Sequence, residues 1–473
     1  MGTLENNNQT RKIDHLTIKD GQFLYKNEVF DDEQLAKEYK EDGDNPDNNN
    51  LKSEYETNKK DGSHLIAKHL VSEYNVKTID QREREIFIYN NGAYVAGVNT
   101  IRSRIQKILE ELATAHVKND ILDRIRDLTI TDRKDFNPSS NLINLNNGVF
   151  DLEKKELFGH NPEYLFFYKI PVDYKPDTDC PAIKKFLSEI LNEKDMPIIQ
   201  EWLGYALYRR YFIKKAVIFV GEKNTGKTTF LRLSSTFIGP NNVSGVSLQK
   251  LSSDKFSAAH LYNKHINIFD DLSFKDINDN GAFKIATGGG YITGEYKFGS
   301  QFQFENYAKL TFSCNKIPNI KDTHDEAYFS RWIVIEFKKT VENPDKFLID
   351  KLTQPEELSG LLNFALKGLF RILEKHDFSY EMNPEEIKVQ MLRSGSVVAN
   401  FAYDCLEEST DYWIDKDGMY EKFVDYARSE NMPIIPKNDF GRKICEYADY
   451  LIDSKSDKKT GWRNARFKES KIS

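Results

Sequence analysis

One short run, GEKNTGKT at 221–228, directly follows the apolar stretch AVIFV. Four of its positions match the pattern G-x-x-x-x-G-K-[ST]: Gly221, Gly226, Lys227 and Thr228. Glycines at these places let backbone N–H groups curl around phosphates, and the helix expected from KTTFLRLSSTFI would point its N-terminal dipole at the same charge. The order of strand, loop and helix predicts that the chain binds a nucleoside triphosphate.

We expect this loop to hold ATP through the following residues: Gly221, Glu222, Lys223, Asn224, Thr225, Gly226, Lys227, Thr228 and Thr229. Lys227 would reach the β- and γ-phosphates, and Thr228 would ligate Mg²⁺. A second apolar stretch, INIFDD, ends in two acids. Asp270 would hold the metal directly or through water, and Asp271 would orient or deprotonate the attacking water. DDLSF also permits a helix N-cap at Asp271.

Two further polar residues border apolar stretches. Asn315 ends FSCN, where its side chain would touch the γ-phosphate and the water, although it also suits the start of the turn NKIPN. Arg331 directly precedes WIVIEF. A cation there would reach a γ-phosphate in a neighbouring subunit, and the alternative is a solvated arginine at a strand edge.

The length of 473 residues indicates several domains, and the alternation of strands and helices predicts an α/β fold with a mostly parallel central sheet. We predict five parts: an acidic, weakly ordered segment or linker at 1–63, a mainly helical domain with hairpins at 64–205, an α/β nucleotide-binding core at 206–345, a helical lid or linker at 346–409, and a small α+β domain resembling a winged helix at 410–473.

The net charge of −7 is unevenly distributed. Residues 1–63 carry 15 acidic and 9 basic groups, whereas the last twenty residues carry 7 basic and 2 acidic groups. A basic C-terminal domain can therefore meet DNA phosphates despite the negative total. The residues expected to do so are Lys437, Arg442, Lys443, Lys458, Lys459, Arg463 and Arg466. A solvated basic tail and a domain that packs between subunits remain the alternatives.

Several classes of protein are disfavoured by composition. No run approaches the roughly 18 apolar residues of a membrane helix, so we expect no membrane partner, and MGTLENNNQTRK is no secretory signal. The 4 cysteines are scattered without a CxxC pair, which argues against a zinc site and a disulfide framework. A reducing, cytoplasmic compartment fits this usage.

The motifs in their order resemble superfamily 3 helicases, a branch of the AAA+ ATPases. The resemblance is particularly to the primase-helicases of poxviruses, satellite phages and archaeal or bacterial mobile elements. ATGGGYITGEYKFGSQFQFENYAKLTFSCNKIPN is similar to that group's signature stretch, and LINLNNGVFDLEKKEL and IIQEWLGYALYRR look like parts of its helical N-terminal domain. The resemblance covers roughly 140–340 and extends more weakly to residue 64 and to the C-terminus.

The resemblance implies a ring, usually a hexamer, that encircles single-stranded or forked DNA and binds ATP between subunits. Lys227, Asp270, Asp271 and Asn315 would act from one subunit, and Arg331 from the next. The hairpin at 291–304 would project into the pore. There Lys297 and Phe298 would contact the DNA, whereas a solvated hairpin lysine is the alternative for Lys297.

These expectations together predict an ATP-driven helicase for replication of a viral, plasmid or integrated mobile element. An ATP-controlled DNA-binding initiator or loader without processive unwinding is the main alternative. A P-loop kinase or metabolic ATPase fits less well with the basic C-terminus. Residues 1–140 offer no convincing pair of primase acids, so we expect no primer synthesis by this chain, and a separately encoded primase is a candidate partner.

Overall fold

The computed structural model of the chain describes four short strands between Arg11 and Phe30 and then residues 46–468. Within the latter range, the described residues exclude 81–82, 137–138, 255, 274–279, 296–300, 319–324, 338, 342–344 and 457–458. The chain divides into two units, one of Met1–Pro138 with His160–Phe167, and one of Ser139–Gly159 with Tyr168–Ser473. The mixed α/β character predicted from the sequence is confirmed.

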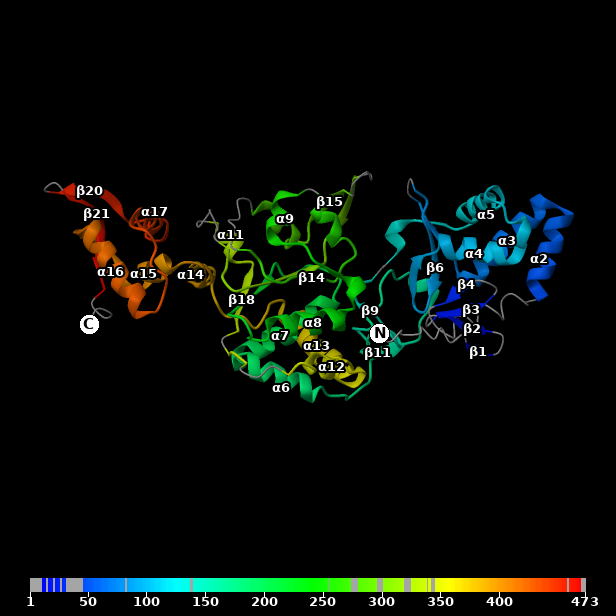
Figure 1. Ribbon diagram of the computed structural model, residues 1–473, viewed down its shortest axis with the longest axis horizontal. Coiled ribbons are helices and arrows are strands. Elements are labelled where there is room, and N and C mark those ends of the chain that lie inside the picture. Colours follow the sequence, from blue (N-terminus) through cyan, green and yellow to red (C-terminus); the bar gives the residue numbers. More distant parts are fainter. Residues whose placement is uncertain are drawn as a thin grey trace, which may run out of the picture. The chain divides into compact units, whose positions relative to one another are not determined.

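In the residues that the structure describes, the first unit combines two small sheets with α-helices (Figure 1). An antiparallel meander consists of β1 (Arg11–Ile13), β2 (Leu16–Lys19), β3 (Gln22–Tyr25) and β4 (Glu28–Phe30). The second sheet has the order β7-β6-β5-β8, with β5 (Lys77–Ile79), β6 (Ile86–Asn90), β7 (Ala93–Ala96) and β8 (Ile130–Thr131). The helices are α2 (Pro46–Thr57), α3 (Lys59–Tyr74), α4 (Val98–Leu109) and α5 (Ala115–Leu128). Their apolar faces share one core, which includes Ile66, Ile105 and Ile121.

Helix α2 lies in a segment whose composition predicts weak order. Tyr55 is only 4% exposed and packs into the core of the first unit. A Cβ atom at Gly62 of α3 would lie 2.2 Å from the Cα atom of Tyr55, so only glycine permits this approach of the two helices. Tertiary packing thus holds an Asn-rich helix of low intrinsic propensity. The predicted weak order does not hold for residues 46–63.

The second unit is built on a parallel five-stranded sheet in the order β13-β14-β17-β12-β18. Its strands are β12 (Ala216–Val220), β13 (Val243–Ser244), β14 (Ile266–Phe269), β17 (Lys309–Cys314) and β18 (Trp332–Glu336). Every residue of β12 and β17 is buried, as expected for strands of a parallel sheet that is covered on both faces. The mostly parallel central sheet predicted from the sequence is confirmed.

Helices cover this sheet. They are α6 (Pro181–Ile190), α7 (Met196–Leu207), α8 (Lys227–Ile238), α9 (Leu248–Ser253), α10 (Gly281–Ala286), α11 (Glu326–Phe329), α12 (Leu348–Leu352) and α13 (Pro355–Lys375). Figure 1 shows α6, α7, α12 and α13 gathered on one side of the sheet. A separate antiparallel sheet consists of β9 (Leu142–Leu145), β10 (Gly148–Asp151) and β11 (Glu156–Phe158). Helices α6 and α7 belong to this second unit, so the predicted domain at 64–205 is divided between the two units.

Helices α7 and α13 pack closely because glycines remove the side chains between them. A Cβ atom at Gly204 would lie 2.3 Å from the carbonyl oxygen of Ala365, and one at Gly368 would lie 2.3 Å from that of Gln200. The fully buried carboxylate of Glu201 accepts a hydrogen bond of 2.5 Å from Nε of Arg371. These contacts join α7, which precedes the parallel sheet in the sequence, to α13, which follows it.

Two buried basic residues, Lys309 and His265, lie at the amino ends of the neighbouring strands β17 and β14. The ammonium group of Lys309 donates hydrogen bonds to the carbonyl oxygens of Tyr208 and Tyr307, at 2.6 and 2.8 Å, and burial lowers its pKa well below the ordinary value. Nδ1 of His265 lies 2.9 Å from the carbonyl oxygen of Ala206, and burial lowers the pKa of this histidine to about 3. His265 is therefore neutral at pH 7. Lys309 ties β17 to Tyr208, directly after α7, and His265 ties the start of β14 to Ala206 in the last turn of α7.

An antiparallel hairpin of β15 (Tyr291–Glu295) and β16 (Gln301–Glu305) precedes β17. Ile292 and Phe304 pair across it and are buried in the core of the second unit. The two strands of the predicted hairpin are confirmed. Its tip, which carries Lys297 and Phe298, lies outside the described residues.

The C-terminal part of the second unit has its own core. Its helices are α14 (Pro384–Gly395), α15 (Val397–Cys405), α16 (Lys416–Ser429) and α17 (Lys437–Tyr447). Its sheet has the order β19-β21-β20, with β19 (Leu406–Asp415), β20 (Ile452–Ser456) and β21 (Lys459–Phe467). Phe401, Phe423, Phe440 and Trp462 are buried together. Because α15 contributes Phe401, this core begins before residue 410, where the sequence pattern had placed its start.

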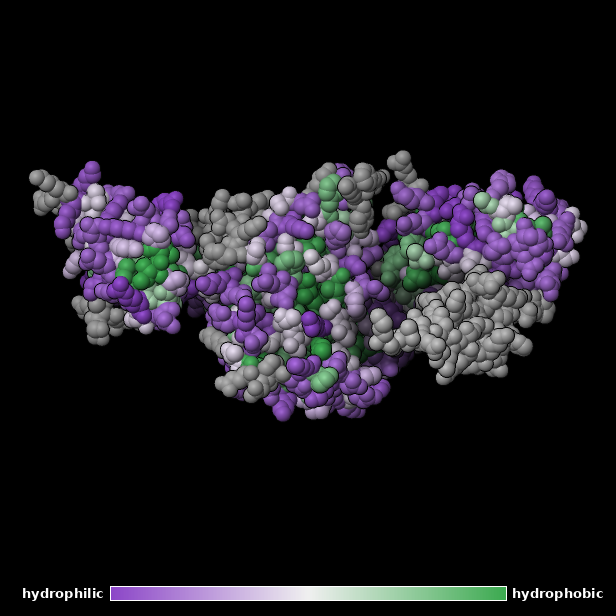
Figure 2. All heavy atoms as spheres, viewed as in Figure 1, coloured by the Kyte–Doolittle hydropathy of each residue, from purple (hydrophilic) through white to green (hydrophobic). Residues whose placement is uncertain are grey.

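Hydrophilic residues dominate the visible surface of the protein (Figure 2). Among the helices formed by the described residues, none is both long and apolar enough to span a membrane.

Two glycine-to-alanine substitutions, one at the contact between α7 and α13 and one on α17, should have opposite effects on stability. Gly368→Ala places a methyl group against the backbone of Gln200 and should lower the free energy of unfolding by about 1–3 kcal/mol. Gly441→Ala, in the middle of α17 with nothing within 4 Å of the new atom, should raise helix stability by up to about 1 kcal/mol. Denaturant unfolding followed by circular dichroism measures both. Equal stability of the two variants would contradict the close packing.

Candidate functional site

The loop between β12 and α8 has a backbone that few side chains allow. A Cβ atom at Gly221 would lie 2.3 Å from the carbonyl oxygen of Phe337. Gly226 has φ +89°, and a Cβ atom there would also lie 2.8 Å from Cγ2 of Ile190 in α6. Asn224 is left-handed as well, with φ 62°. The loop therefore folds back tightly before α8 begins at Lys227, and the first N–H groups of α8 face out of the helix end without intrahelical partners.

Lys227 is 7% exposed, and its ammonium group is turned into the loop. It donates hydrogen bonds to the carbonyl oxygens of Gly221 and Glu222, at 2.6 and 2.8 Å, and to Oγ1 of Thr225 at 3.3 Å. Burial lowers the pKa of Lys227, with Asp270 as the largest opposing charge. The cation is thus enclosed by neutral oxygen atoms, which suits a place where an anion is to be received.

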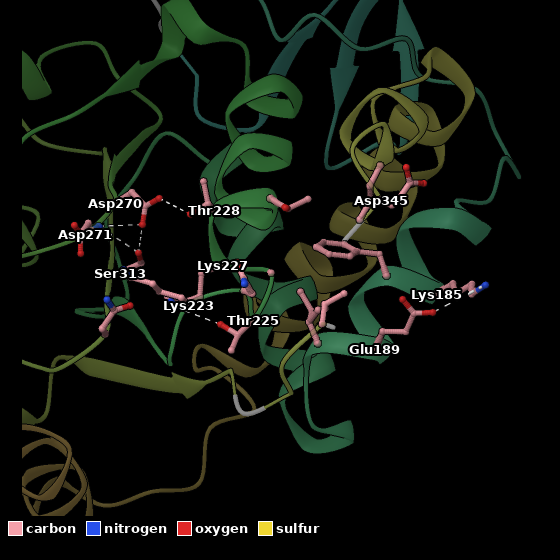
Figure 3. Close-up of a pocket in the computed structure, with 18 of the residues that line it drawn as sticks. Lys185, Glu189, Lys223, Thr225, Lys227, Thr228, Asp270, Asp271, Ser313 and Asp345 are labelled. Carbon is pink, nitrogen blue, oxygen red and sulfur yellow. Dashed lines mark hydrogen bonds and ion pairs between the residues drawn. The ribbon is translucent and has the colours of Figure 1, made fainter. Parts of the chain in front are cut away.

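The carboxylate of Asp270 is the meeting point of three elements (Figure 3). Thr228, in the first turn of α8, donates a hydrogen bond of 2.7 Å from Oγ1 to Oδ2 of Asp270. Ser313 of β17 donates from Oγ to the other oxygen, Oδ1. The backbone N–H of Asp271 donates to Oδ1 at 2.9 Å. The structure therefore brings together the two residues that the sequence assigned to the metal, Thr228 and Asp270.

Asp271 follows in the left-handed conformation, with φ 57°. Residues 272 and 273 are not helical, so Asp271 is not the N-cap that DDLSF permits. Asn315 directly follows β17, and the parallel register of Val220 with Cys314 places it beside the loop. Both Asp271 and Asn315 line the same cavity as Lys227.

This cavity has a volume of about 830 Å³, which lies in the range of small-molecule sites. Beyond the loop, it is lined by residues of α6, α12 and the chain before α12: Ala182, Lys185, Phe186, Glu189, Ile190, Val341, Asp345, Leu348 and Lys351. Two hydrogen bonds hold the chain before α12 against the loop and α6. Val341 N–H donates to the carbonyl oxygen of Asn224 at 2.9 Å, and Lys339 Nζ donates to that of Ser188 at 3.1 Å.

Sequence reasoning missed this wall and Ser313. Residues of α6 and α12 carry no phosphate-binding pattern, and only the fold brings them to the loop. Ser313 left only a weak signal, its place two positions before Asn315, because KLTFSC contains two further polar residues, Lys309 and Thr311.

Arg331 lies at the amino ends of the parallel strands, whereas the loop lies at their carboxyl ends. Its carbonyl oxygen accepts a hydrogen bond of 2.7 Å from the N–H of Ala216, at the start of β12, whereas the loop follows Val220 at the end of that strand. Four residues of a strand separate the two ends by about 13 Å. The guanidinium of Arg331 donates a hydrogen bond to the carbonyl oxygen of Ala327, and burial lowers the pKa of Arg331. Arg331 is thus not part of the cavity around Lys227.

The predicted DNA-binding residues have different surroundings. Lys297, Phe298 and Lys458 lie outside the described residues. Three cations are paired with acids of the same domain: Lys437 with Asp417, Arg442 with Asp439, and Arg466 with Glu407. Lys459 and Arg463 are exposed, whereas Lys443 is half-buried.

Comparisons with known proteins support part of this picture. Residues 33–192 match the family model described as D5 N terminal like, and residues 219–331 match a family of unknown function, DUF5906. The first match agrees with the resemblance of the chain to replication primase-helicases, and the second spans the loop at 221–228, Asp270 and Asn315. No curated protein sequence matches the chain.

Solved structures of an apo C-terminal region of NrS-1 are similar to the chain at low identity. One is 15% identical, covers 82% of this chain and 87% of its own, and has a TM-score of 0.47. Another, of residues 305–718, is 15% identical, covers 85% and 98%, and has a TM-score of 0.48.

Proposed function

We propose that the chain is an ATP-driven DNA helicase or translocase of the superfamily 3 AAA+ type, which serves the replication of a viral, plasmid or integrated mobile element. The observation that carries this proposal is the arrangement around Asp270. Its carboxylate binds the hydroxyl group of Thr228 at the carboxyl edge of a parallel sheet, directly beside the glycine loop and Lys227. Hydroxyl and carboxylate oxygens at the N-terminus of a helix are the donors that a magnesium nucleotide requires.

The residues of the cavity suit ATP with Mg²⁺. The loop and the first N–H groups of α8 would hold the phosphates, and Lys227 would turn from its carbonyl partners to the β- and γ-phosphates. Thr228 and Asp270 would hold Mg²⁺, which supplies charge neutralisation on the phosphate oxygens. Ser313, through its hydrogen bond to Oδ1, would keep the carboxylate of Asp270 in place.

Two polar residues remain for the attacking water. The carboxylate of Asp271 would orient the water or accept its proton, and the amide of Asn315 would contact the water and the γ-phosphate. Both line the cavity beside Lys227. The left-handed backbone of Asp271 supports this role, because strained residues of this kind are frequent at reactive sites.

The position of Arg331 supports a ring of subunits. This residue lies at the amino ends of the strands, away from the loop of its own chain. It would therefore complete the site of a neighbouring subunit, as the resemblance implies. The hairpin β15–β16 would then present Lys297 to DNA in the central pore. The C-terminal order of helix, strand, two helices and two strands supports a winged helix as a further DNA-binding domain.

Removal of the Lys227 ammonium tests the nucleotide site. Lys227→Ala should lower the rate of ATP hydrolysis by at least about 100-fold, because the phosphates lose their enclosed cation. Lys250→Ala, an exposed lysine of α9, is the matched control and should keep the rate of the unmodified protein. The release of inorganic phosphate at saturating Mg²⁺ measures both. Unchanged hydrolysis by Lys227→Ala, with normal folding, would refute the proposed site.

Mixing of two inactive variants tests the shared site. Arg331→Ala should abolish hydrolysis while the affinity for ATP stays within a few fold, because the arginine acts on the transition state. An equimolar mixture with Lys227→Ala should regain activity, since some interfaces then combine an intact loop with an intact arginine. A mixture as inactive as its components would contradict an arginine that acts between subunits.

Strand displacement separates a helicase from an ATP-controlled initiator or loader. The full chain should displace the labelled strand of a forked DNA only when ATP and Mg²⁺ are present, and Lys227→Ala should not. ATP hydrolysis that is stimulated by DNA without any displacement would instead favour the initiator.

A further inference from the structure

The C-terminal sheet has an inner and an outer face. Trp462 of β21 marks the inner face, because it is 1% exposed and lies beneath Lys416 of α16, whose Nζ is 4.8 Å from the ring centroid. The next position, Arg463, pairs with Trp413 on one side and Ile452 on the other. Alternation along a strand places this row of three residues on the opposite face, which we call the outer face.

Aromatic and apolar side chains are exposed on and beside the outer face. Ile452 is 56% exposed and Tyr412 is 52% exposed. Tyr412 lies within the irregular pairing between Glu408 and Trp413, so strand alternation does not place it, and its position beside the outer face rests on its contact with Arg466. The ring of Trp413 lies across Gly461, where a Cβ atom would be 2.3 Å from its carbon Cε2. A hollow of about 430 Å³ is lined by Tyr412, Trp413, Ile414, Asp415, Arg466 and Phe467. Nε1 of Trp413 has no hydrogen-bond partner among the described residues.

The charge on this face is positive. Arg463 and Lys459 are exposed, lie four positions apart on β21 and therefore point to the same side. No ion pair joins either of them to an acid in the described part of the chain. Arg466 is held differently: Glu407 accepts a hydrogen bond from its Nε at 2.5 Å, and its guanidinium lies 5.9 Å from the ring centroid of Tyr412. Arg466 thus packs against the ring of Tyr412 and has its charge balanced by Glu407. The charges of Arg463 and Lys459 are not balanced in this way.

Helix α17 is less suited to phosphate. Two of its three cations are engaged by acids of the same domain, Lys437 by Asp417 and Arg442 by Asp439. The third, Lys443, is half-buried and forms no ion pair with an acid in the part of the chain that the structure describes. The uncompensated positive charge and the exposed rings of the C-terminal domain therefore coincide on the sheet and not on the helix.

We propose that the outer face of the β19–β21–β20 sheet binds single-stranded DNA, with a base stacked on Tyr412 and backbone phosphates on Arg463 and Lys459. Only unpaired bases offer their faces to an aromatic ring, whereas a duplex would offer phosphates alone. This inference rests on the proposed function for the choice of DNA as the partner. It assigns the contact to a surface other than the helix of the domain.

Binding of labelled oligonucleotides to the full chain without ATP tests the proposal. The probes are an oligothymidine of about 20 nucleotides, an abasic strand of the same length and a duplex hairpin. Tyr412→Ala should raise the Kd for oligothymidine by about 5- to 150-fold and leave the Kd for the abasic strand unchanged. Tyr412→Phe should bind like the unmodified protein, because the ring remains.

Removal of a positive charge from the outer face should affect binding differently from removal of the Tyr412 ring. Arg463→Ala should weaken both single strands alike and lower the slope of log Kd against log salt by about 0.7, since one phosphate contact is lost. Lys443→Ala, which removes a cation of α17, is the matched control and should change neither value. Salt titrations by fluorescence anisotropy provide both quantities.

Three results would overturn the proposal: unchanged oligothymidine binding by Tyr412→Ala, an equal loss for the thymidine and abasic strands in that variant, or a loss by Tyr412→Ala that is confined to the hairpin. The last result would assign the face to duplex DNA. The proposed helicase function fails separately, because it depends on ATP hydrolysis and strand displacement. The rate of basal ATP hydrolysis should be the same in Tyr412→Ala and the unmodified protein.

Discussion

The register between three neighbouring parallel strands is the constraint on which the candidate site depends. Strand β17 lies between β12 and β14, with Val220 opposite Cys314 and Phe269 opposite Phe312. The carboxyl ends of all three strands consequently meet at one edge, where open α/β sheets bind their ligands. A shift of one residue along β17 would turn the hydroxyl of Ser313 away from Asp270. The buried ammonium of Lys309 opposes such a shift by holding the amino end of the strand.

Three polar side chains of the site directly follow residues whose positions are fixed by close contacts or by sheet pairing. Lys227, Asp270 and Ser313 adjoin Gly226, Phe269 and Phe312, which are set by close contacts or by the sheet. The reactive side chains therefore inherit their positions from backbone packing and not from long flexible loops. The wall of α6 and α12 differs, because its charged side chains are exposed and its place depends on hydrogen bonds such as that from Val341 to Asn224.

The strands and the loop could be predicted from the sequence because their signals are local. AVIFV is a continuous apolar run followed by glycines at fixed spacing, and INIFDD ends a second such run. Ser313 was missed because nothing local distinguishes its hydroxyl from that of Thr311 in the same buried strand, and its partner lies 43 positions away. Helix α2 was missed because its order comes from one buried tyrosine and one close glycine in α3, not from its own Asn-rich composition. The pairing of Arg442 with Asp439 shows likewise that basic composition does not measure available charge.

The contact between α7 and α13 also constrains the order of events during synthesis. Glu201 and Arg371, which join the two helices, are 170 positions apart in the chain. At about 5–20 residues per second, a ribosome needs about 10–30 s to make the intervening segment. During that interval the apolar face of α7 lacks its partner, and the backbone of Gly204 stays open to water. The nascent protein is therefore exposed to aggregation and to chaperone binding until α13 leaves the ribosome.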